Sequence, residues 1–305
     1  MRQKIMSNNC IETYQLTKQY GKKTAVNQLD LTVKKGGIHA FVGSNGAGKS
    51  TLFRLLLGVT TATSGGAKVL GQECQNLSTE LRGKVGYVNE EHTLPNWMTV
   101  EKVRAMQKHF YSAWNDNIYQ RVIGYFDVDP KQKVSGLSRG ERAGFNLSMA
   151  LAQSPELLIL DEPTLGLDVV AKQSFLEALM FTETENESTI IYCSHQMEEV
   201  ERVADNLIIL EKGRLRNNSA PDDFVERISS WIVDFDSKQV EKNAIAGLLS
   251  MKLIDGQHHI IAIDQQVVAF RQHLQLLGAS EMHPMGVTLN SAVNAFLSKN
   301  HNVPA

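Results

Sequence analysis

The sequence predicts an α/β fold with a buried parallel sheet, followed by a small α+β unit. An apolar segment at 38–42 leads through a glycine-rich loop into a helical pattern, which is typical of α/β units. Continuous apolar runs at 157–160 and 189–193 indicate strands that are covered on both faces. Near the end of the chain, short strands alternate with helical stretches. A length of 305 residues suits two domains, which we expect at 1–215 and 216–305.

The composition narrows the class of protein. Hydrophobic residues make up 42% of the chain and charged residues 21%, as in ordinary globular domains. The formal net charge of −2 does not favour a nucleic-acid partner. Cys10, Cys74 and Cys193 have no metal or redox spacing, which fits reduced thiols in the cytosol. The N-terminus lacks the apolar centre of a signal peptide, and no apolar run approaches the roughly 18 residues of a membrane span. We therefore expect any membrane role to depend on a partner.

The first elements are expected to be strands. Residues 11–33 have strand patterns around a turn at Tyr20-Gly21-Lys22-Lys23, and another short strand is expected at 67–70. Tyr20 has two interpretations. It is either a hairpin aromatic that packs on the sheet or a ring that stacks on adenine, and the local sequence does not choose between them.

The loop after the 38–42 strand carries the strongest functional pattern. It consists of Gly43, Ser44, Asn45, Gly46, Ala47, Gly48, Lys49, Ser50 and Thr51, which match G-x-x-x-x-G-K-[ST] between a strand and a helix. Glycines let successive N–H groups converge on a phosphate, and the helix start adds further free N–H groups. We expect Lys49 to reach the β- and γ-phosphates and Ser50 to bind Mg²⁺. A chance glycine-rich turn is disfavoured because the loop, the lysine, the hydroxyls and both flanking elements are all present.

A helical region is expected in the middle of the chain. A strand at 84–88 is followed by a polar loop that contains Glu90, and Thr99 is placed to cap a helix from Val100. The helical pattern continues to about Asp129. We interpret its aromatic residues as core positions of a helical subdomain at about 90–153. These residues are Phe110, Tyr111, Trp114, Tyr119, Tyr125 and Phe126.

The segment Leu137-Ser138-Arg139-Gly140-Glu141 begins another helix. Ser138 stands where an N-cap belongs, and Glu141, three residues later, completes a capping box. A capped helix start is also an anion site, so a structural and a functional interpretation of this segment hold together.

Carboxylates follow the apolar strand at 157–160. Asp161 and Glu162 lie at the carboxyl end of this strand, where ligands bind in open α/β sheets. Two buried charges need a partner, and Mg²⁺ with its nucleotide supplies one. We expect Asp161 to hold the metal, and Glu162 to orient or deprotonate the attacking water. His195 follows the 189–193 strand, so it is expected to face the same pocket, although a lone histidine is more often a surface or core residue.

After a change of composition at 217–221, the sequence predicts a small α+β unit without an assignable catalytic motif. The expected helices are 222–230, 238–251, 265–277 and 289–299, and the expected strands are 231–235 and 259–263. His258, His259 and His273 have no convincing metal-ligand spacing.

Together, these motifs resemble those of the nucleotide-binding subunit of an ABC transporter. The resemblance covers about residues 11–215 and includes the phosphate loop, the Leu137–Glu141 signature, the 161–162 carboxylates, the 166–168 turn and His195, in the family's order. It implies a P-loop NTPase core with an antiparallel β subdomain and a helical signature subdomain. The tail before the final helix is similar to tails of single-domain exporter ATPases that work beside a separately encoded permease.

The resemblance also implies roles for individual residues in a head-to-tail, ATP-dependent homodimer. Tyr20 matches the aromatic that stacks on adenine. Ser138 and Gly140 are expected to contact the γ-phosphate across the dimer, and His195 to contact the γ-phosphate bound in its own subunit. The chain is then expected at the cytoplasmic face of the cell membrane, bound there through an integral membrane permease. The transported substrate is not fixed by the class.

This sequence departs from the family pattern at three positions. Glu90 stands where Gln is usual, so an oxygen remains for Mg²⁺ but a charge is added. In the signature, Arg139 replaces the usual Gly and Glu141 the usual Gln, which we expect to be tolerated because Ser138 and Gly140 remain.

Two other functions compete with ATP-driven export. A soluble ABC ATPase that acts on ribosomes or DNA would usually carry a second ATPase domain or long coiled-coil segments, whereas this chain has one phosphate loop and no sustained heptads. A regulatory module that binds ATP without turnover is disfavoured because Lys49, Asp161, Glu162 and His195 are all present.

Overall fold

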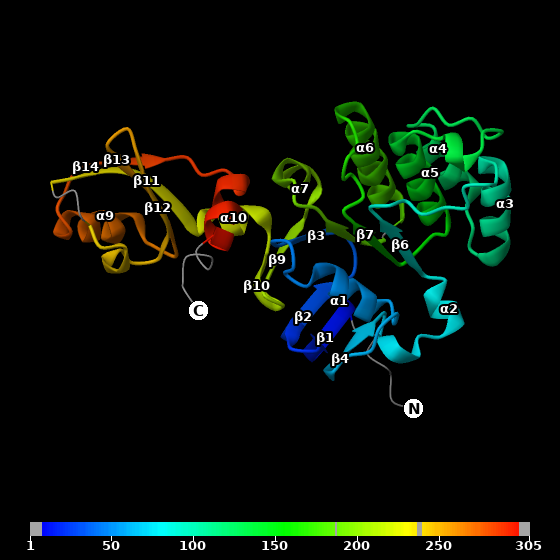
Figure 1. The fold of residues 1–305 in the computed structure, drawn as a ribbon, viewed down its shortest axis with the longest axis horizontal. Helices are drawn as coiled ribbons and strands as arrows, with labels where there is room; N and C mark the ends of the chain where they lie inside the picture. The colour runs from blue at the N-terminus through cyan, green and yellow to red at the C-terminus, as the bar shows by residue number, and fades with distance from the viewer. Residues whose placement is uncertain (1–7, 187, 237–239, 299–305) are drawn as a thin grey trace. The chain divides into compact units, whose positions relative to one another are not determined.

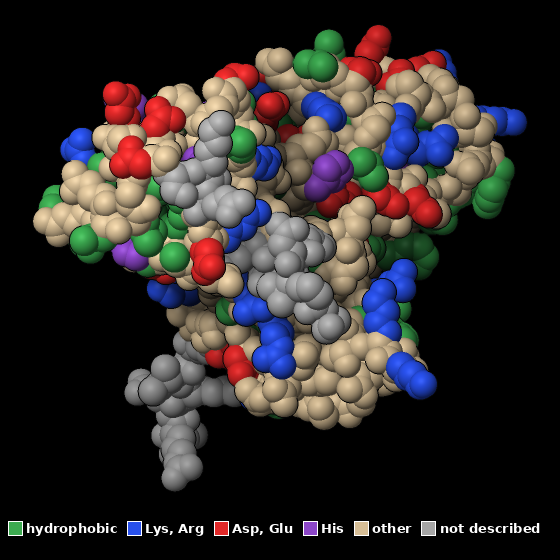
Figure 2. Space-filling model, turned by 60° about the vertical axis from the view of Figure 1, so that its left-hand side comes forward, with side chains coloured by type: hydrophobic (Ala, Val, Ile, Leu, Met, Phe, Trp, Pro, Cys, Tyr) green, Lys and Arg blue, Asp and Glu red, His purple; other side chains and the backbone are tan. Residues whose placement is uncertain are grey.

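The structure, a computed structural model, describes residues 8–186, 188–236 and 240–298. The chain forms two compact units, which divide between Asn218 and Ser219. Figure 1 shows that each unit contains its own sheet and its own helices. Figure 2 shows Lys and Arg side chains interspersed with Asp and Glu over one face, in keeping with the net charge of −2. None of the helices within the described ranges is long and apolar enough to cross a membrane.

A six-stranded sheet forms the centre of the first unit, in the order β10-β9-β3-β8-β7-β6. Its strands are β3 (Ile38–Val42), β6 (Val85–Asn89), β7 (Leu157–Asp161), β8 (Thr189–Cys193), β9 (Asn206–Glu211) and β10 (Arg214–Ser219). The pairings from β6 through β7, β8 and β3 to β9 are parallel. Asn89, Asp161 and Cys193 are paired in register, so the carboxyl ends of three strands meet at one edge. This edge is where ligands bind in open α/β sheets.

Both faces of this sheet are covered. Every residue of β3, β7 and β8 is buried, as the continuous apolar runs predicted. Leu157 and Ile159 pack in one core cluster with α1 (Lys49–Leu56), and Leu158 and Leu160 pack in a second. The second cluster includes side chains of α5 (Arg139–Ala152) and α6 (Val169–Asn186). The alternation of strand side chains therefore divides the core between the two faces.

An antiparallel sheet of order β2-β1-β4-β5 packs beside the phosphate-loop helix. Its strands are β1 (Asn9–Tyr20), β2 (Lys23–Lys34), β4 (Ser64–Val69) and β5 (Gln72–Glu73), and the 3₁₀ turn η1 (Cys74–Asn76) follows. Tyr20 pairs with Lys23 across the β1–β2 turn, which puts Tyr20 at the end of the hairpin.

The helical subdomain contains a break that the sequence analysis missed. The pattern from Val100 to about Asp129 forms two helices, α3 (Val100–Phe110) and α4 (Asp116–Ile123), after the short α2 (Thr79–Arg82). Asn115 ends the gap because its side-chain oxygen accepts hydrogen bonds from the first amides of α4. The aromatic positions are only partly core, since Tyr119 is buried but Phe110 is 74% exposed. The 3₁₀ turn η2 (Val134–Gly136) leads to α5.

Two strand regions were missed, one at the end of the first unit and one at the start of the second. Strand β10 extends the large sheet after β9, and it was not predicted. After α7 (Met197–Val203) and β9, the chain runs through β10 into α8 (Pro221–Glu226). Residues 228–230 were expected to be helical but begin strand β11 (Ile228–Phe235).

The second unit is an antiparallel sheet of order β12-β13-β11-β14 with helices. Its other elements are the 3₁₀ turn η3 (Lys242–Ala244), β12 (Leu248–Ile254), β13 (Gln257–Ile263), α9 (Val267–Leu276), β14 (Ala279–Met285) and α10 (Leu289–Ser298). The helix expected at 238–251 is wrong over its described part, and β14 was not predicted; residues 237–239 and 299 lie outside the described ranges. Leu and Met in this stretch favour a helix, but pairing with β13 overrides that preference.

Candidate nucleotide-binding site

The phosphate loop depends on glycines for two separate reasons. Gly46 and Gly48 have φ values of 82° and 105°, which L-residues rarely adopt. A Cβ at Gly48 would lie 2.2 Å from the Ala25 carbonyl oxygen, and one at Gly43 would lie 2.3 Å from the Leu210 carbonyl oxygen. The loop is therefore packed against the backbones of β2 and β9 as well as sharply turned.

Lys49 crosses this loop. Its side chain starts at the first residue of α1, is 9% exposed, and donates from Nζ to the Gly43 carbonyl oxygen at 2.6 Å. The ammonium is thus held beside the loop amides, where it adds a positive charge to the helix N-terminus.

A pocket of about 260 Å³ joins the phosphate loop to carboxylates from two strands. Its lining residues are Lys23, Ala25, Asn45, Gly46, Ala47, Gly48, Lys49, Ser50, Thr51, Glu90, Asp161 and Glu162. Glu90 comes from the loop after β6, and Asp161 ends β7. Sequence-distant residues that were predicted to act together therefore share one cavity.

Glu162 and His195 contact each other at the edge of this site. His195 Nδ1 lies 2.7 Å from Glu162 Oε2, and because a carboxylate accepts, Nδ1 carries the proton. Glu162 is held at a φ of 53°, and its amide donates to the Cys193 carbonyl oxygen at 3.0 Å. Burial raises the pKa of the Cys193 thiol well above its usual value, so this neighbour stays neutral.

The oxygen groups of the pocket fit Mg²⁺ as a nucleotide-bound ion. Ser50, Glu90 and Asp161 offer a hydroxyl and carboxylates, which are the hard ligands that Mg²⁺ prefers. Within the described residues, no group of three or more His, Cys, Asp or Glu is arranged to hold a metal by itself. This suits Mg²⁺, which usually binds through one or two carboxylates together with substrate phosphates and water.

The signature residues lie at the start of α5, and two of them, Leu137 and Arg139, line a second cavity. Ser138 Oγ accepts from the Glu141 amide at 3.2 Å, and Glu141 Oε2 accepts from the Ser138 amide at 2.6 Å, which completes the predicted capping box. Arg139 covers Gly166, where a Cβ would lie 2.6 Å from the guanidinium. The cavity has a volume of about 460 Å³ and is lined by Glu90, Glu91, His92, Leu137, Arg139 and Arg142.

Tyr20 does not line the phosphate-loop pocket, although its strand partner Lys23 does. Its ring is 48% exposed, and Lys18 Nζ is 4.9 Å from the ring centroid. One face of the ring therefore carries a cation–π contact. The stacking role of Tyr20 stays a prediction.

Two buried polar residues near the site were missed. His92 is 1% exposed, and its Nε2 donates to the Pro163 carbonyl oxygen at 2.9 Å. Burial lowers the pKa of His92 to about 4, so the imidazole is neutral at pH 7. Glu199, on α7, is 5% exposed and has three hydroxyl partners. His92 has no local signal, because its partner Pro163 is 71 residues away. Glu199 has partners both near and far in the sequence, and their spacing matches no motif.

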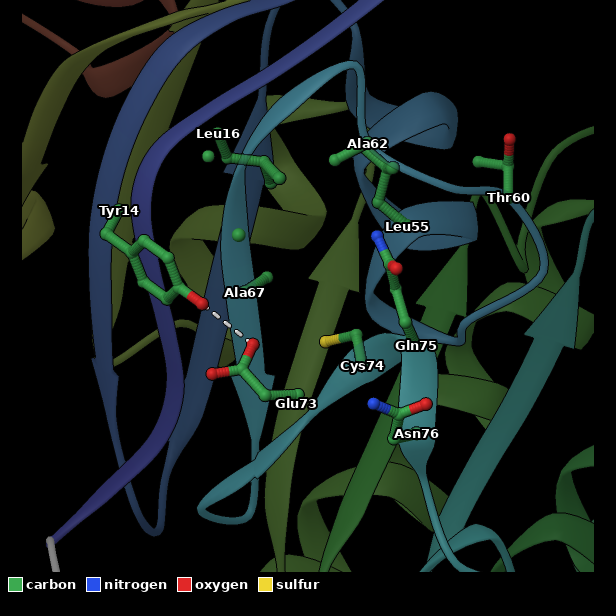
Figure 3. Close-up of a pocket in the computed structure, with 12 residues that line it drawn as sticks. Tyr14, Leu16, Leu55, Thr60, Ala62, Ala67, Glu73, Cys74, Gln75 and Asn76 are labelled. Atoms are coloured by element: carbon green, nitrogen blue, oxygen red, sulfur yellow. Dashed lines mark hydrogen bonds between the residues drawn. The ribbon is translucent and has the colours of Figure 1, made fainter.

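A further cavity of about 190 Å³ is lined by residues of the antiparallel sheet, of α1 and of η1 (Figure 3). Tyr14 and Glu73 meet across it, with the Tyr14 hydroxyl donating to Glu73 Oε2 at 2.8 Å. Leu55 of α1 and Cys74 contribute to its wall. None of the predicted site residues lines this cavity.

The fold and the phosphate-loop pocket define a P-loop nucleotide-binding protein, and comparison with known proteins identifies its family. The family described as ABC transporter matches residues 26–165. Nod factor export ATP-binding protein I of Rhizobium sp. (strain N33) is 34% identical over 226 residues, which are 72% of this chain and 74% of the relative. Bacitracin transport ATP-binding protein BcrA of Bacillus licheniformis is 31% identical over 207 residues, which are 67% of this chain and 68% of the relative. The chain belongs to the ABC transporter family, as an ATP-binding subunit that hydrolyses ATP.

Solved structures agree with this fold. A structure described as the ATP binding subunit of an ABC transporter has a TM-score of 0.64 and 24% identity, and covers 71% of this chain and 92% of its own. A dimeric post-hydrolysis ATP-binding cassette, MJ0796 bound to ADP and Pi, has a TM-score of 0.61 and 20% identity. The match covers 69% of this chain and 98% of that structure's chain. The predicted fold class and family are confirmed, and the interpretation as a ribosome- or DNA-acting ATPase is not supported.

Proposed function

We propose that this chain energises export through a separate integral membrane permease, which holds it at the cytoplasmic face of the membrane. The observation that carries the proposal is the pocket that unites Lys49 with Glu90, Asp161 and Glu162 in a chain related to Nod factor export and bacitracin transport proteins. Those relatives are named as ATP-binding proteins, which supports a division of labour between this chain and a permease.

Each group of site residues has a separate role in ATP hydrolysis. Lys49 neutralises the β- and γ-phosphates, and the amides of residues 43–51 surround them. Ser50, Glu90 and Asp161 would hold Mg²⁺, which when bound neutralises phosphate charge. Glu162 orients or deprotonates the attacking water, and His195 contacts the γ-phosphate while its Nδ1 holds Glu162. Tyr20 stacks on the adenine ring.

A head-to-tail homodimer completes each site. In one chain, none of the signature residues lines the phosphate-loop pocket, and Leu137 and Arg139 line a second cavity, which supports a role for the signature towards the nucleotide of a second copy. Ser138 and Gly140 contact the γ-phosphate there, with Arg139 and Glu141 shaping the start of α5. Its free amides suit an anion.

The site assignment is tested with Glu162→Gln and, as a control, Glu198→Gln, which changes an exposed residue of α7. Steady-state ATPase activity should fall by about 100-fold or more in Glu162→Gln, as expected for loss of a general base, and stay unchanged in the control. Light scattering should show an ATP-dependent dimer of Glu162→Gln. Undiminished turnover would contradict the role of Glu162, and a monomer at saturating ATP and Mg²⁺ would contradict the cross-dimer site.

The permease is tested by affinity purification of the chain from detergent-solubilised native membranes, followed by mass spectrometry. A polytopic membrane protein in stoichiometric amount is expected, and its identity then narrows the substrate. Recovery of ribosomal proteins or nucleic acid without a membrane protein would overturn the transport assignment.

A further inference from the structure

Glu199 forms the centre of a buried polar cluster that involves the chain segments next to Glu162 and His195. Its Oε2 accepts hydrogen bonds from Thr164 Oγ1, Tyr192 Oη and Ser194 Oγ, each at 2.8 Å. All four side chains are buried, with exposed fractions of 5% for Glu199 and 1% or less for its partners. One carboxylate oxygen is therefore the common acceptor of three hydroxyl groups.

The three hydroxyls come from the two segments that carry the proposed catalytic pair. Thr164 lies two residues after Glu162, and Ser194 directly precedes His195. Tyr192 belongs to β8, which leads into that histidine. Glu199 itself is on α7, the helix that follows the histidine. The carboxylate thus joins the loop after β7 to the loop after β8, and the 2.7 Å contact between Glu162 and His195 joins the same two segments.

The two carboxylate oxygens of Glu199 differ in their surroundings, because Oε1 is buried without a hydrogen-bond partner among the described residues. A buried carboxylate is costly unless donors surround it. Three hydroxyls satisfy Oε2, and Lys172 Nζ lies 3.9 Å from Oε1. Burial, together with the Glu199 charge, raises the pKa of Tyr192, so its hydroxyl stays a protonated donor. An ionised carboxylate only accepts, whereas an amide would add donors in the same space.

We infer that Glu199 is a positioning residue for ATP hydrolysis: it fixes the separation of the Glu162 and His195 loops and thereby keeps the two side chains in contact. The inference depends on the proposed roles of Glu162 and His195. Glu199 does not line the phosphate-loop pocket, so it acts on the chemical step rather than on nucleotide binding.

The first test compares Glu199→Gln with the control Glu198→Gln in the full-length chain. The measurements are the Kd of a fluorescent ATP analogue, kcat and KM for ATP, and the thermal midpoint. For Glu199→Gln we expect a Kd within about twofold of wild type and a kcat at least tenfold lower, since charged buried hydrogen bonds are among the stronger ones. A parallel loss of nucleotide affinity and kcat, together with a large fall in thermal midpoint, would indicate a scaffold role and overturn the inference.

A double-mutant cycle separates positioning from general damage. In a His195→Ala background, Glu199→Gln should change single-turnover hydrolysis by less than about twofold, because the contact that Glu199 maintains is already gone. The same tenfold loss in both backgrounds would overturn the inference. Full turnover in Glu162→Gln would contradict the proposed function itself. This result is separate from the double-mutant cycle, which tests only the positioning role of Glu199.

Thr164 supplies a second pair of variants in case Glu199→Gln does not fold. Thr164→Ser keeps the hydroxyl donor, whereas Thr164→Val keeps the shape and removes the donor. We expect Thr164→Ser to retain kcat and Thr164→Val to lose it about tenfold at unchanged Kd. Equal kcat values for the two variants would contradict the role of the cluster.

Discussion

Gly46 and Gly48 have similar left-handed backbones but different surroundings. A Cβ at Gly46 meets no atom within 4 Å, whereas one at Gly48 would lie 2.2 Å from the Ala25 carbonyl oxygen. We therefore predict that Gly46→Ala lowers the free energy of unfolding by about 1–2 kcal/mol, the usual cost of a positive φ. Gly48→Ala should cost about 3 kcal/mol or more, because the β2 backbone must move as well.

Urea unfolding of both variants without nucleotide measures this difference, with Gly46→Ala as the matched control for backbone strain. Equal destabilisation would mean that the contact with β2 carries no energetic weight. A stability measurement also keeps this prediction separate from any loss of phosphate binding.

The candidate site could be predicted from sequence only where its chemistry is local. The phosphate loop is one continuous stretch, so its glycines and Lys49 were identified by spacing, and Asp161 and Glu162 by their place after an apolar strand. His92 and Glu199 could not be identified in this way. The partner of His92, Pro163, is 71 residues away in the chain. Glu199 has two partners within seven residues, but the third, Thr164, is 35 residues away, and only the fold shows that the three meet at one oxygen.

At the scale of elements, prediction succeeded for strands that are buried on both faces and failed where packing overrides propensity. The apolar runs at 157–160 and 189–193 were predicted as strands covered on both faces, and they form the fully buried strands β7 and β8. Strand β12, by contrast, contains good helix formers and is held as a strand by β13. Just before it, Gly247 has a φ of 64°, and a Cβ there would lie 2.3 Å from the Ile263 carbonyl oxygen.

The break between α3 and α4 is secured by Asp116. Its carboxylate accepts from Lys108 Nζ, from Arg104 Nη2 at 2.7 Å and from Trp114 Nε1 at 2.9 Å. These donors, Lys108 first, hold the pKa of Asp116 well below its usual value. A lowered carboxyl pKa stabilises the fold above about pH 4, and this contribution is lost as the pH falls further.

We predict that Asp116→Asn lowers the free energy of unfolding at pH 7 by about 1 kcal/mol or less, because partial exposure screens the charges. The difference between wild type and variant should shrink as the pH falls below about 4. Urea titrations at several pH values, followed by tryptophan fluorescence, measure it, and the exposed Asp127→Asn serves as the control. A difference that does not depend on pH would show that charge is not the cause.

At the scale of the whole molecule, each unit has its own core. Trp231, Val233, Ile260 and Phe270 belong to a cluster of the second unit, whereas every residue that lines the phosphate-loop pocket belongs to the first. We predict that a chain ending at Asn218 folds and binds a fluorescent ATP analogue with a Kd within about threefold of the full chain.

Lys49→Ala in the shortened chain is the control, and it should abolish binding. If the shortened chain is insoluble or does not bind the analogue, the prediction is wrong and the second unit is needed to maintain the nucleotide site. Cooperative thermal unfolding of the shortened chain is the accompanying measurement.

The strand order of the large sheet has a consequence for synthesis on the ribosome. Strand β3 pairs only with β8 and β9, and Ile38 is paired with Ile190 about 150 residues later. At roughly 5–20 residues per second, translation leaves β3 without either neighbour for about 8–30 s. During that time a strand that is fully buried in the fold, with four apolar residues and His39, is exposed in the nascent chain together with the phosphate loop. The ATP-binding core therefore closes near the end of its own translation, and until then it is a natural client for chaperones that cover nascent apolar segments.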